Sequence, residues 1–203
     1  MNNSALYNIN CGLFVLTACA DGKQNGCIIN TVMQATAEPV VKISVIVNKS
    51  NHTTDMILKT GKFNVSCIDE SADFDLFKNF GFSSGRNTNK FETFDGFAKA
   101  ENGINYITKN TNAYFSAKVV ETVDVGSHYI FVAEVTEAEV LSELPSASYS
   151  YYHKNIKPKP EKKPSEKTRW VCKICGYVYE GEELPEGYVC PICNHPASDF
   201  EKM

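Results

Sequence analysis

The chain has 203 residues, of which 43% are hydrophobic and 22% are charged, and its formal net charge is −4. This composition is ordinary for a globular protein and allows one large domain or one medium and one small domain. The weakly negative charge gives no support to a nucleic-acid or acidic-membrane partner. No run reaches the roughly 18 apolar residues of a membrane span, and no secretory signal is visible. We therefore expect a cytoplasmic protein that binds neither nucleic acid nor membrane.

Residues 1–152 consist mostly of short segments rich in Val, Ile, Thr, Tyr and Phe, a pattern typical of β-strands. Strands are predicted at residues 13–20, 40–47, 63–68, 113–123 and 129–140. Helices are predicted at residues 53–60 and 73–80, because Gly61 and Gly81 follow them and glycine commonly stands just past a helix end. The expected fold is mainly β, an antiparallel barrel or sandwich with a few short helices.

Residues 153–167 interrupt this pattern with alternating lysine and proline and almost no apolar side chains. Such a composition favours an extended spacer rather than a packed element. The chain is therefore expected to divide into a larger domain, residues 1–152, a linker, residues 153–167, and a small domain, residues 168–203.

The eight cysteines fall into two groups of four. Cys11, Cys19, Cys27 and Cys67 are scattered through strand-like surroundings, and we interpret them as reduced thiols of a cytoplasmic protein. The other group is two Cys-x2-Cys pairs, Cys172 with Cys175 and Cys190 with Cys193, separated by 14 residues. Each pair can form a tight turn with both sulfurs on one side, and two facing turns make a tetrahedral cage for zinc or iron.

The residues around this cage favour iron over zinc. Aromatic side chains crowd the small domain and can supply its core and exclude water from the sulfurs: Trp170, Tyr177, Tyr179, Tyr188 and Phe200. Gly176 and Asn194, the residues that follow the two pairs, tolerate a left-handed backbone. With Pro185, Gly187 and Pro191, this segment resembles the short rubredoxins fused to rubrerythrin-like proteins. The resemblance implies one iron that passes single electrons, and a structural zinc ribbon is the alternative.

The larger domain contains neither a GxGxxG nor a GxxxxGK[ST] motif, so a Rossmann or P-loop nucleotide site is not expected. Three of its segments, residues 21–39, 48–54 and 126–135, resemble in order and spacing the flavin reductase-like family of FMN-binding split barrels. A fourth, residues 82–91, resembles a loop of the same family. The resemblance implies a split β-barrel that binds FMN, and in this family the flavin sites lie near the interface of a homodimer.

The resemblance also places the cofactor. Two groups of residues are candidates for binding FMN. A predicted turn, residues 25–31, offers backbone N–H groups and small polar side chains to the flavin ring, although a plain hairpin loop would look the same. The segment before the helix at residue 53 offers hydroxyls, positive charge and free helix N–H groups to a phosphate, although Ser50 or Thr53 could simply cap that helix. The candidates are Asn25, Cys27, Ile28, Asn30, Thr31, Asn48, Lys49, Ser50, His52, Thr53 and Lys90.

His128 is the candidate catalytic residue. It occupies the place of the histidine in the family's Gly-Asp-His motif, with Ser127 in place of the acid, and the resemblance implies that it helps to seat the nicotinamide. A histidine that is merely hydrogen-bonded at a strand start is the structural alternative. Cys27 has no identifiable His or Asn partner, so a catalytic thiol is not expected there.

The whole arrangement resembles the high-molecular-weight rubredoxins. It implies an enzyme that takes a hydride from NAD(P)H onto FMN and passes single electrons through the four-cysteine iron to a redox protein, such as a flavodiiron oxygen or nitric oxide reductase. Two alternatives stay open: a flavin-binding carrier without NAD(P)H oxidation and with a zinc ribbon that docks partners, and an electron carrier reduced by another protein.

Overall fold

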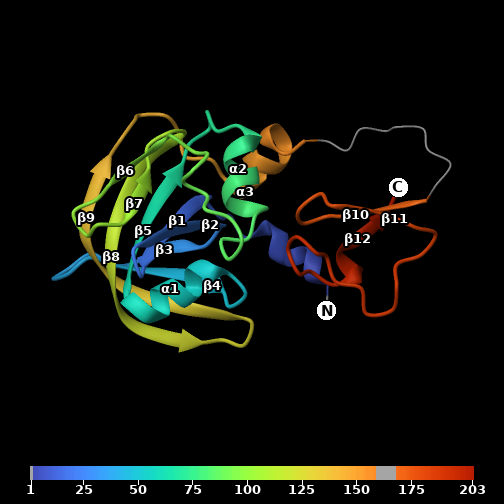
Figure 1. Ribbon diagram of the computed structural model, residues 1–203, viewed down its shortest axis with the longest axis horizontal. Helices are drawn as coiled ribbons and strands as arrows, with labels where there is room; N and C mark the ends of the chain where they lie inside the picture. Colours follow the sequence, from blue (N-terminus) through green and yellow to red (C-terminus); the bar gives the residue numbers. More distant parts are fainter. Residues whose placement is uncertain (1, 159–167) are drawn as a thin grey trace. The chain divides into compact units, whose positions relative to one another are not determined.

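The computed structural model describes residues 2–158 and 168–203 and divides into two compact units, Met1–Ile156 and Lys157–Met203 (Figure 1). The helix η2 (Tyr152–Ile156) ends the first unit, and its Tyr152 is buried there. The first unit thus includes four residues, 153–156, of the expected linker. Residues 159–167 of that linker lie outside the described residues.

The first unit is built on a seven-stranded sheet with the strand order β2-β1-β5-β8-β9-β4-β3 and antiparallel pairing throughout. The strands are β1 (Phe14–Ala20), β2 (Lys23–Ile29), β3 (Val32–Thr36), β4 (Lys42–Asn48), β5 (Lys62–Ile68), β8 (Thr111–Asp124) and β9 (His128–Val140). A small hairpin is formed by β6 (Phe97–Lys99) and β7 (Asn105–Ile107). The helices are η1 (Asn3–Asn8), α1 (His52–Thr60), α2 (Phe74–Gly81), α3 (Tyr149–Tyr151) and η2.

Two apolar clusters pack against the sheet. One fills the inside of the curved sheet and contains Phe63 and Phe131, both without solvent exposure, and the buried face of α1. The other lies between β1 and α2 and contains Leu76, Phe77 and Phe80. Because strands of one sheet surround the first cluster, the mainly β, split-barrel fold predicted from the sequence is confirmed.

Two local predictions are wrong. The expected turn at residues 25–31 is mostly strand β2, because the two-residue turn Asp21-Gly22 joins it to β1 and Ala20 pairs directly with Lys23. Gly81 does not lie past α2 but is its last residue, and its backbone is not left-handed. Gly61 behaves as expected, since it follows α1 with a φ of 64° and donates its N–H to the carbonyl of Ile57.

The second unit is a three-stranded sheet with the order β11-β10-β12, formed by β11 (Val178–Glu180), β10 (Arg169–Cys172) and β12 (Phe200–Lys202). The short helix η3 (Ala197–Asp199) precedes β12. Its core contains Phe200 and two of the cysteines, with Trp170, Tyr177, Tyr179 and Tyr188 packed around them. The aromatic residues therefore supply the core predicted for them. Within the part of the chain that the structure describes, no helix is long and apolar enough to cross a membrane.

Candidate functional site

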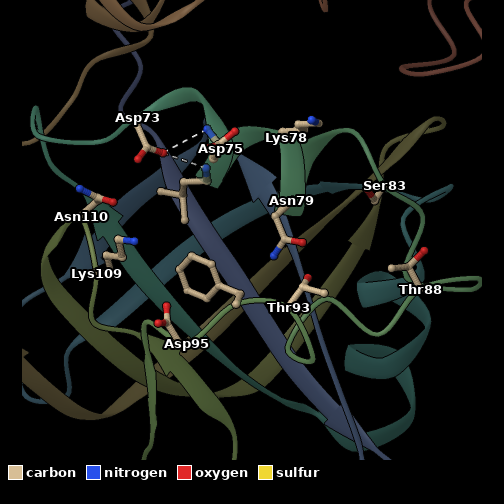
Figure 2. A pocket seen from close by; sticks show the side chains of 12 residues that line it. Asp73, Asp75, Lys78, Asn79, Ser83, Thr88, Thr93, Asp95, Lys109 and Asn110 are labelled. Atoms are coloured by element: carbon tan, nitrogen blue, oxygen red, sulfur yellow. Dashed lines mark hydrogen bonds between the residues drawn. The ribbon is translucent and has the colours of Figure 1, made fainter.

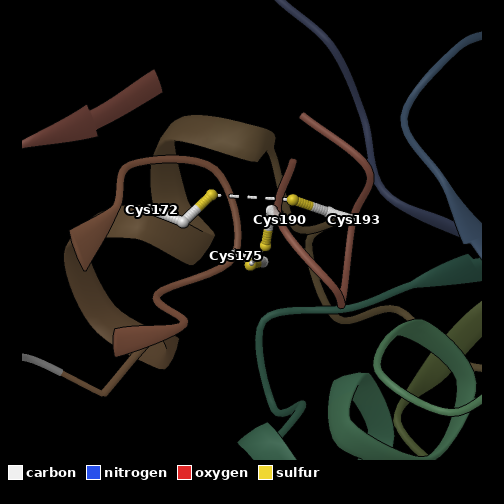
Figure 3. A group of neighbouring side chains, drawn as sticks. All are labelled: Cys172, Cys175, Cys190 and Cys193. Atoms are coloured by element: carbon white, nitrogen blue, oxygen red, sulfur yellow. Dashed lines mark hydrogen bonds between the residues drawn. The ribbon is translucent and has the colours of Figure 1, made fainter. Parts of the chain in front are cut away.

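The four cysteines of the second unit lie together, and their sulfurs point toward one another (Figure 3). Cys172 Sγ lies 3.6 Å from Cys193 Sγ, Cys175 Sγ lies 3.5 Å from Cys190 Sγ, and all four sulfurs are within 4.8 Å of one another. In a tetrahedral thiolate site with metal–sulfur bonds of about 2.3 Å, neighbouring sulfurs are about 3.8 Å apart. The cage therefore fits one tetrahedral metal ion of the zinc or iron kind.

Both cysteine pairs end in a left-handed residue, Gly176 with a φ of 80° and Asn194 with a φ of 58°, as predicted. The N–H of Gly176 donates to the carbonyl of Cys172, and that of Asn194 donates to the carbonyl of Cys190. The two turns thus share one hydrogen-bonding pattern, which places their sulfurs on the same side of each turn. A side chain other than Gly or Asn would be strained at either position.

Backbone N–H groups also point at the sulfurs. Cys172 Sγ accepts from the amides of Cys175 and Ile174, Cys175 Sγ from the amide of Tyr177, and Cys193 Sγ from the amide of His195. A hydrogen bond from Cys193 is the main reason that the pKa of Cys175 falls to about 5, and the same contact raises the pKa of Cys193. The backbone N–H donors stabilise thiolates, which are the form that binds a metal, and they tune the potential of a bound iron.

The candidate flavin residues in and after β2 differ in how deeply they are buried. Asn25 and Cys27 are buried, whereas Ile28 is half-buried. Burial raises the pKa of the Cys27 thiol, against the opposing effect of a hydrogen bond from the Thr53 hydroxyl. Asn30 and Thr31 lie beyond the end of the strand, and the Thr31 hydroxyl donates to the Asn30 side chain over 3.1 Å. Cys27 and Thr53 bring β2 into contact with the start of α1.

The start of α1 carries no side-chain cap. Asn51 is its N-cap residue, and its side-chain amide donates instead to Cys27 Sγ over 3.6 Å. The Thr54 hydroxyl donates to the carbonyl of Asn48, and the Ser50 amide donates to the Asn48 side chain. Neither Ser50 nor Thr53 caps the helix, so the capping alternative for these two hydroxyls is not what the structure shows. The N–H of Thr54 donates to the carbonyl of Asn51, whereas the N–H groups of His52 and Thr53 have no hydrogen-bond partner among the described residues and are available to an anion.

The charged side chains near this helix start are already paired with others. Lys49 forms an ion pair with Asp124. His52 and Asp55 lie on the first turn of α1 and both contact the Arg86 guanidinium, His52 Nδ1 at 3.2 Å and the Asp55 carboxylate at 2.6 Å. Sequence reasoning placed Arg86 in a family-like loop but did not single it out. Its only sequence signal was the Phe82-Ser-Ser-Gly-Arg segment itself.

Lys90 is almost fully buried, and its ammonium donates to the carbonyls of Gly26, at 2.7 Å, and Phe80, at 3.0 Å. Burial lowers its pKa, and the neighbouring Cys27 acts in the opposite direction. Lys90 therefore ties the loop that follows α2 to β2. The Lys90 ammonium also acts electrostatically on the Cys27 thiol and lowers its pKa, against the larger effect of burial.

His128 is the first residue of β9 and pairs in register with Asn48 of β4. The Ser127 hydroxyl lies 2.8 Å from its Nδ1. The amide of Lys49 donates to the carbonyl of Ser127 over 3.0 Å, so the turn before β9 lies against the segment before α1. The structure thus brings His128, the 48–54 segment and the buried part of β2 to the same region of the barrel.

A separate cavity of about 500 Å³ lies beside α2 (Figure 2). Its lining is polar and of mixed charge and includes Asp73, Asp95 and Lys109. None of the site residues predicted from the sequence lines it. Asn79 connects the two regions, since it lines the cavity and its side chain donates to the carbonyl of Lys90.

Comparison with known proteins agrees with this two-part construction. Residues 6–159 match the flavin reductase like domain family, and residues 170–201 match the rubredoxin-like domain of rubrerythrin. The high molecular weight rubredoxin of Moorella thermoacetica is 32% identical, with both chains covered completely. The ferric-chelate reductase (NAD(P)H) of Archaeoglobus fulgidus is 37% identical over 75% of this chain and 89% of its own.

A solved structure supports the fold of the first unit. The FMN-binding protein from Thermus thermophilus superposes with a TM-score of 0.59 at 20% identity, over 66% of this chain and 73% of that one. The matches to the flavin reductase and rubredoxin-like families cover both units, and the cysteine cage stands where the second family requires a metal. The chain therefore belongs to the flavin reductase family in its high molecular weight rubredoxin form, an oxidoreductase with a flavin domain and an iron-binding rubredoxin-like domain.

Proposed function

We propose that this protein oxidises NAD(P)H with FMN as its flavin and passes the electrons singly, through iron held by Cys172, Cys175, Cys190 and Cys193, to a redox protein. The observation that carries the proposal is the uncapped start of α1, which lies beside β2 and the first residue of β9 in a chain that also holds a tetrathiolate cage. A flavin is needed because iron cannot accept a hydride. Iron is suited to the second step because it exchanges one electron at a time.

The phosphate of FMN is assigned to the start of α1. The N–H groups of His52 and Thr53 and the helix dipole favour an anion, and the Ser50 and Thr53 side chains lie at the same end of the helix. A terminal phosphate of a mononucleotide is the group that suits a helix end of this kind. The fold neighbour from Thermus thermophilus is likewise an FMN-binding protein.

The flavin ring is assigned to the β2 side of the site. Asn25 and Cys27 are buried there, Ile28 is half-buried, and Lys90 holds a positive charge behind them. When bound, the flavin accepts a hydride and returns its two electrons in separate steps. His128 would contact the nicotinamide, with the Ser127 hydroxyl fixing the orientation of its ring. The name of the Archaeoglobus fulgidus relative, a ferric-chelate reductase that uses NAD(P)H, supports this donor.

We further propose a homodimer in the cytoplasm. β3 lies at one edge of the sheet, and exposed apolar residues lie on it and on the segment that joins it to β4: Met33 at 63%, Val40 at 42% and Val41 at 40% exposure. An exposed edge strand with apolar side chains is commonly covered by a second chain. Cys11, Cys19, Cys27 and Cys67 are all unbridged, which suits a reducing compartment.

The acceptor we propose is a redox protein such as a flavodiiron oxygen or nitric oxide reductase. The alternative is a flavin-binding carrier that does not oxidise NAD(P)H itself and whose cage holds structural zinc. Anaerobic titration of the purified protein with NADH, following the flavin and iron absorption bands together, separates the two. The proposal expects the flavin band and then the ferric band to bleach. A colourless cage that holds one zinc, or a flavin that NADH leaves oxidised, would favour the alternative.

The assignment of the phosphate has its own test. The double substitution Ser50→Ala with Thr53→Ala should weaken FMN binding by about 1–3 kcal/mol, the range for losing hydrogen bonds to a charged group. Thr60, at the other end of α1, is the matched control because its hydroxyl bonds only the carbonyl of Met56 within the helix. Equal FMN affinity in the double variant and in Thr60→Ala would place the phosphate elsewhere.

A further inference from the structure

The turn that carries His128 is poorly supported by the core of the barrel. β8 and β9 are long, and the end of β8 is exposed from Glu121 onward, as are residues 125–127 of the turn. No residue between 120 and 128 belongs to either apolar cluster of the first unit. Backbone pairing holds His128 against Asn48 and Tyr129 against Asp124, and beyond this pairing the position of the hairpin end depends on polar side-chain contacts.

One ion pair supplies such contacts. Lys49 Nζ lies 2.6 Å and 2.7 Å from the two carboxylate oxygens of Asp124, although the residues are 75 positions apart. The same ammonium lies 4.6 Å from the centre of the Tyr129 ring. Asp124 is the last residue of β8, and Tyr129 is the second residue of β9. The Lys49 ammonium therefore contacts both strands at the end of the hairpin.

The contacts continue into the turn itself. The Asp124 carboxylate also accepts a hydrogen bond from the backbone N–H of Gly126 over 2.9 Å. Gly126 has a left-handed backbone with a φ of 92°. The backbone of Lys49 donates to the carbonyl of Ser127, the neighbour of His128. The Lys49 ammonium first, and then the Gly126 amide, hold the pKa of Asp124 below its usual value, so the carboxylate is charged at neutral pH.

We propose that Lys49 and Asp124 are positioning residues, whose ion pair holds the turn at residues 125–127, and with it His128, in place for the nicotinamide. Lys49 then does not serve as a ligand of the flavin phosphate, which was its predicted role, because its charge is already engaged by Asp124. The inference rests on the proposed function, in which His128 contacts the nicotinamide. It adds a residue, Asp124, that no sequence motif singled out.

The chain contains a matched control pair. Lys59 and Asp21 form an ion pair of the same geometry, with distances of 2.7 Å and 2.6 Å, and both side chains are more than half exposed. This pair joins the last turn of α1 to the β1–β2 turn, away from His128. Substitutions in it report the general effect of removing an exposed ion pair from the same unit.

The experiment uses the full chain loaded with FMN and compares Lys49→Met, Asp124→Asn, Lys49→Arg, Lys59→Met and His128→Ala. We expect Lys49→Met and Asp124→Asn each to raise the KM for NADH about three- to tenfold, with kcat and the FMN dissociation constant within about twofold. Combining them should add little, since both break one contact. Lys49→Arg should keep the low KM, and Lys59→Met should change nothing. Faster amide hydrogen exchange of residues 120–130 in Lys49→Met than in the unmodified protein would show that the turn opens more often without the ion pair.

The outcomes separate the possible roles. If Lys49→Met weakens FMN binding and Asp124→Asn does not, Lys49 is a phosphate ligand and the inference is overturned. If His128→Ala raises the KM for NADH but neither Lys49→Met nor Asp124→Asn does, the inference fails and the nicotinamide assignment stands. If His128→Ala leaves the KM unchanged, the nicotinamide assignment fails and the inference falls with it.

Discussion

The side-chain amide of Asn51 lies 3.6 Å from the Sγ of Cys27, so the side chain of the residue that precedes α1 bonds to β2 and not to its own helix. α2 differs in this respect, because Asp73 caps it by accepting from the amides of Asp75 and Leu76. Asn is among the best capping residues, so its diversion is informative. It leaves the start of α1 able to receive an anion. At the start of α2, by contrast, the Asp73 carboxylate already occupies that place and would repel an anion.

This contrast predicts that substitutions at the two N-cap positions change the stability of the protein in opposite directions. Asn51→Asp places a carboxylate at the start of α1, where it can cap the helix and should stabilise the flavin-free protein by about 0.5–1 kcal/mol. The same charge should repel the flavin phosphate and weaken flavin binding by about tenfold or more. Urea unfolding of the flavin-free protein and fluorescence titration with FMN measure the two effects.

Asp73→Ala is the matched control for this substitution. It should lower the stability by about 1 kcal/mol through loss of a true cap and leave flavin affinity unchanged. Tight FMN binding by Asn51→Asp would show that no anion is received at the start of α1.

The metal cage could be predicted from the sequence because its information is local. The spacing of Cys172, Cys175, Cys190 and Cys193 sets the cage, and Gly176 and Asn194 mark the left-handed positions that close each turn. The long β-branched strands of the barrel were likewise recognisable, since burial on one or both faces leaves a clear pattern.

The flavin region was harder to predict because its contacts join segments far apart in the chain. β2 was taken for a turn, since Asn25 and Gly26 are turn residues by composition, yet pairing with β1 makes them a strand. The ion pairs of Arg86 and of Asp124 join positions 31 and 75 residues apart. No spacing within one segment reports such contacts, and only the folded barrel shows that Lys49 is engaged by Asp124.

The thiols of the first unit should differ in reactivity. Burial raises the pKa of Cys67 to about 12, so at pH 8 its thiolate fraction is about three orders of magnitude below that of an ordinary thiol. Cys11 and Cys19 are only half-buried and should be alkylated first. Peptide mapping after brief treatment with iodoacetamide measures the order. Rapid labelling of Cys67 in the folded protein would contradict its burial in β5, and the urea-unfolded chain is the control in which all of them should react.

Removing one sulfur should unfold the second unit and spare the first. Cys172→Ser deletes a fully buried ligand, and metal binding supplies most of the folding free energy of so small a unit. We expect loss of the bound iron and of the ferric colour, with FMN content unchanged. Cys19→Ser, in β1, is the control that should keep the metal. One equivalent of zinc in the unmodified protein, after growth with ample iron, would count against an iron site.

The last prediction concerns the path of the electrons from the first unit to the second. Deleting residues 168–203 should leave NADH able to reduce the flavin and abolish transfer to a rubredoxin-dependent acceptor, because the tetrathiolate iron is the one-electron relay. The two units are each compact, so the truncated chain should fold.

Supplying the excised second unit in trans tests whether the tether matters. A connection of this length gives an effective concentration of order mM, so added free domain should restore transfer only when its concentration approaches that range. Stopped-flow measurement of iron reduction, in the intact chain and in the mixture, gives both rates. The full-length Cys172→Ser variant serves as the control, since it retains the chain but not the iron. If the truncated flavin unit reduces the acceptor as fast as the intact protein does, the iron is not on the path and the cage serves another purpose.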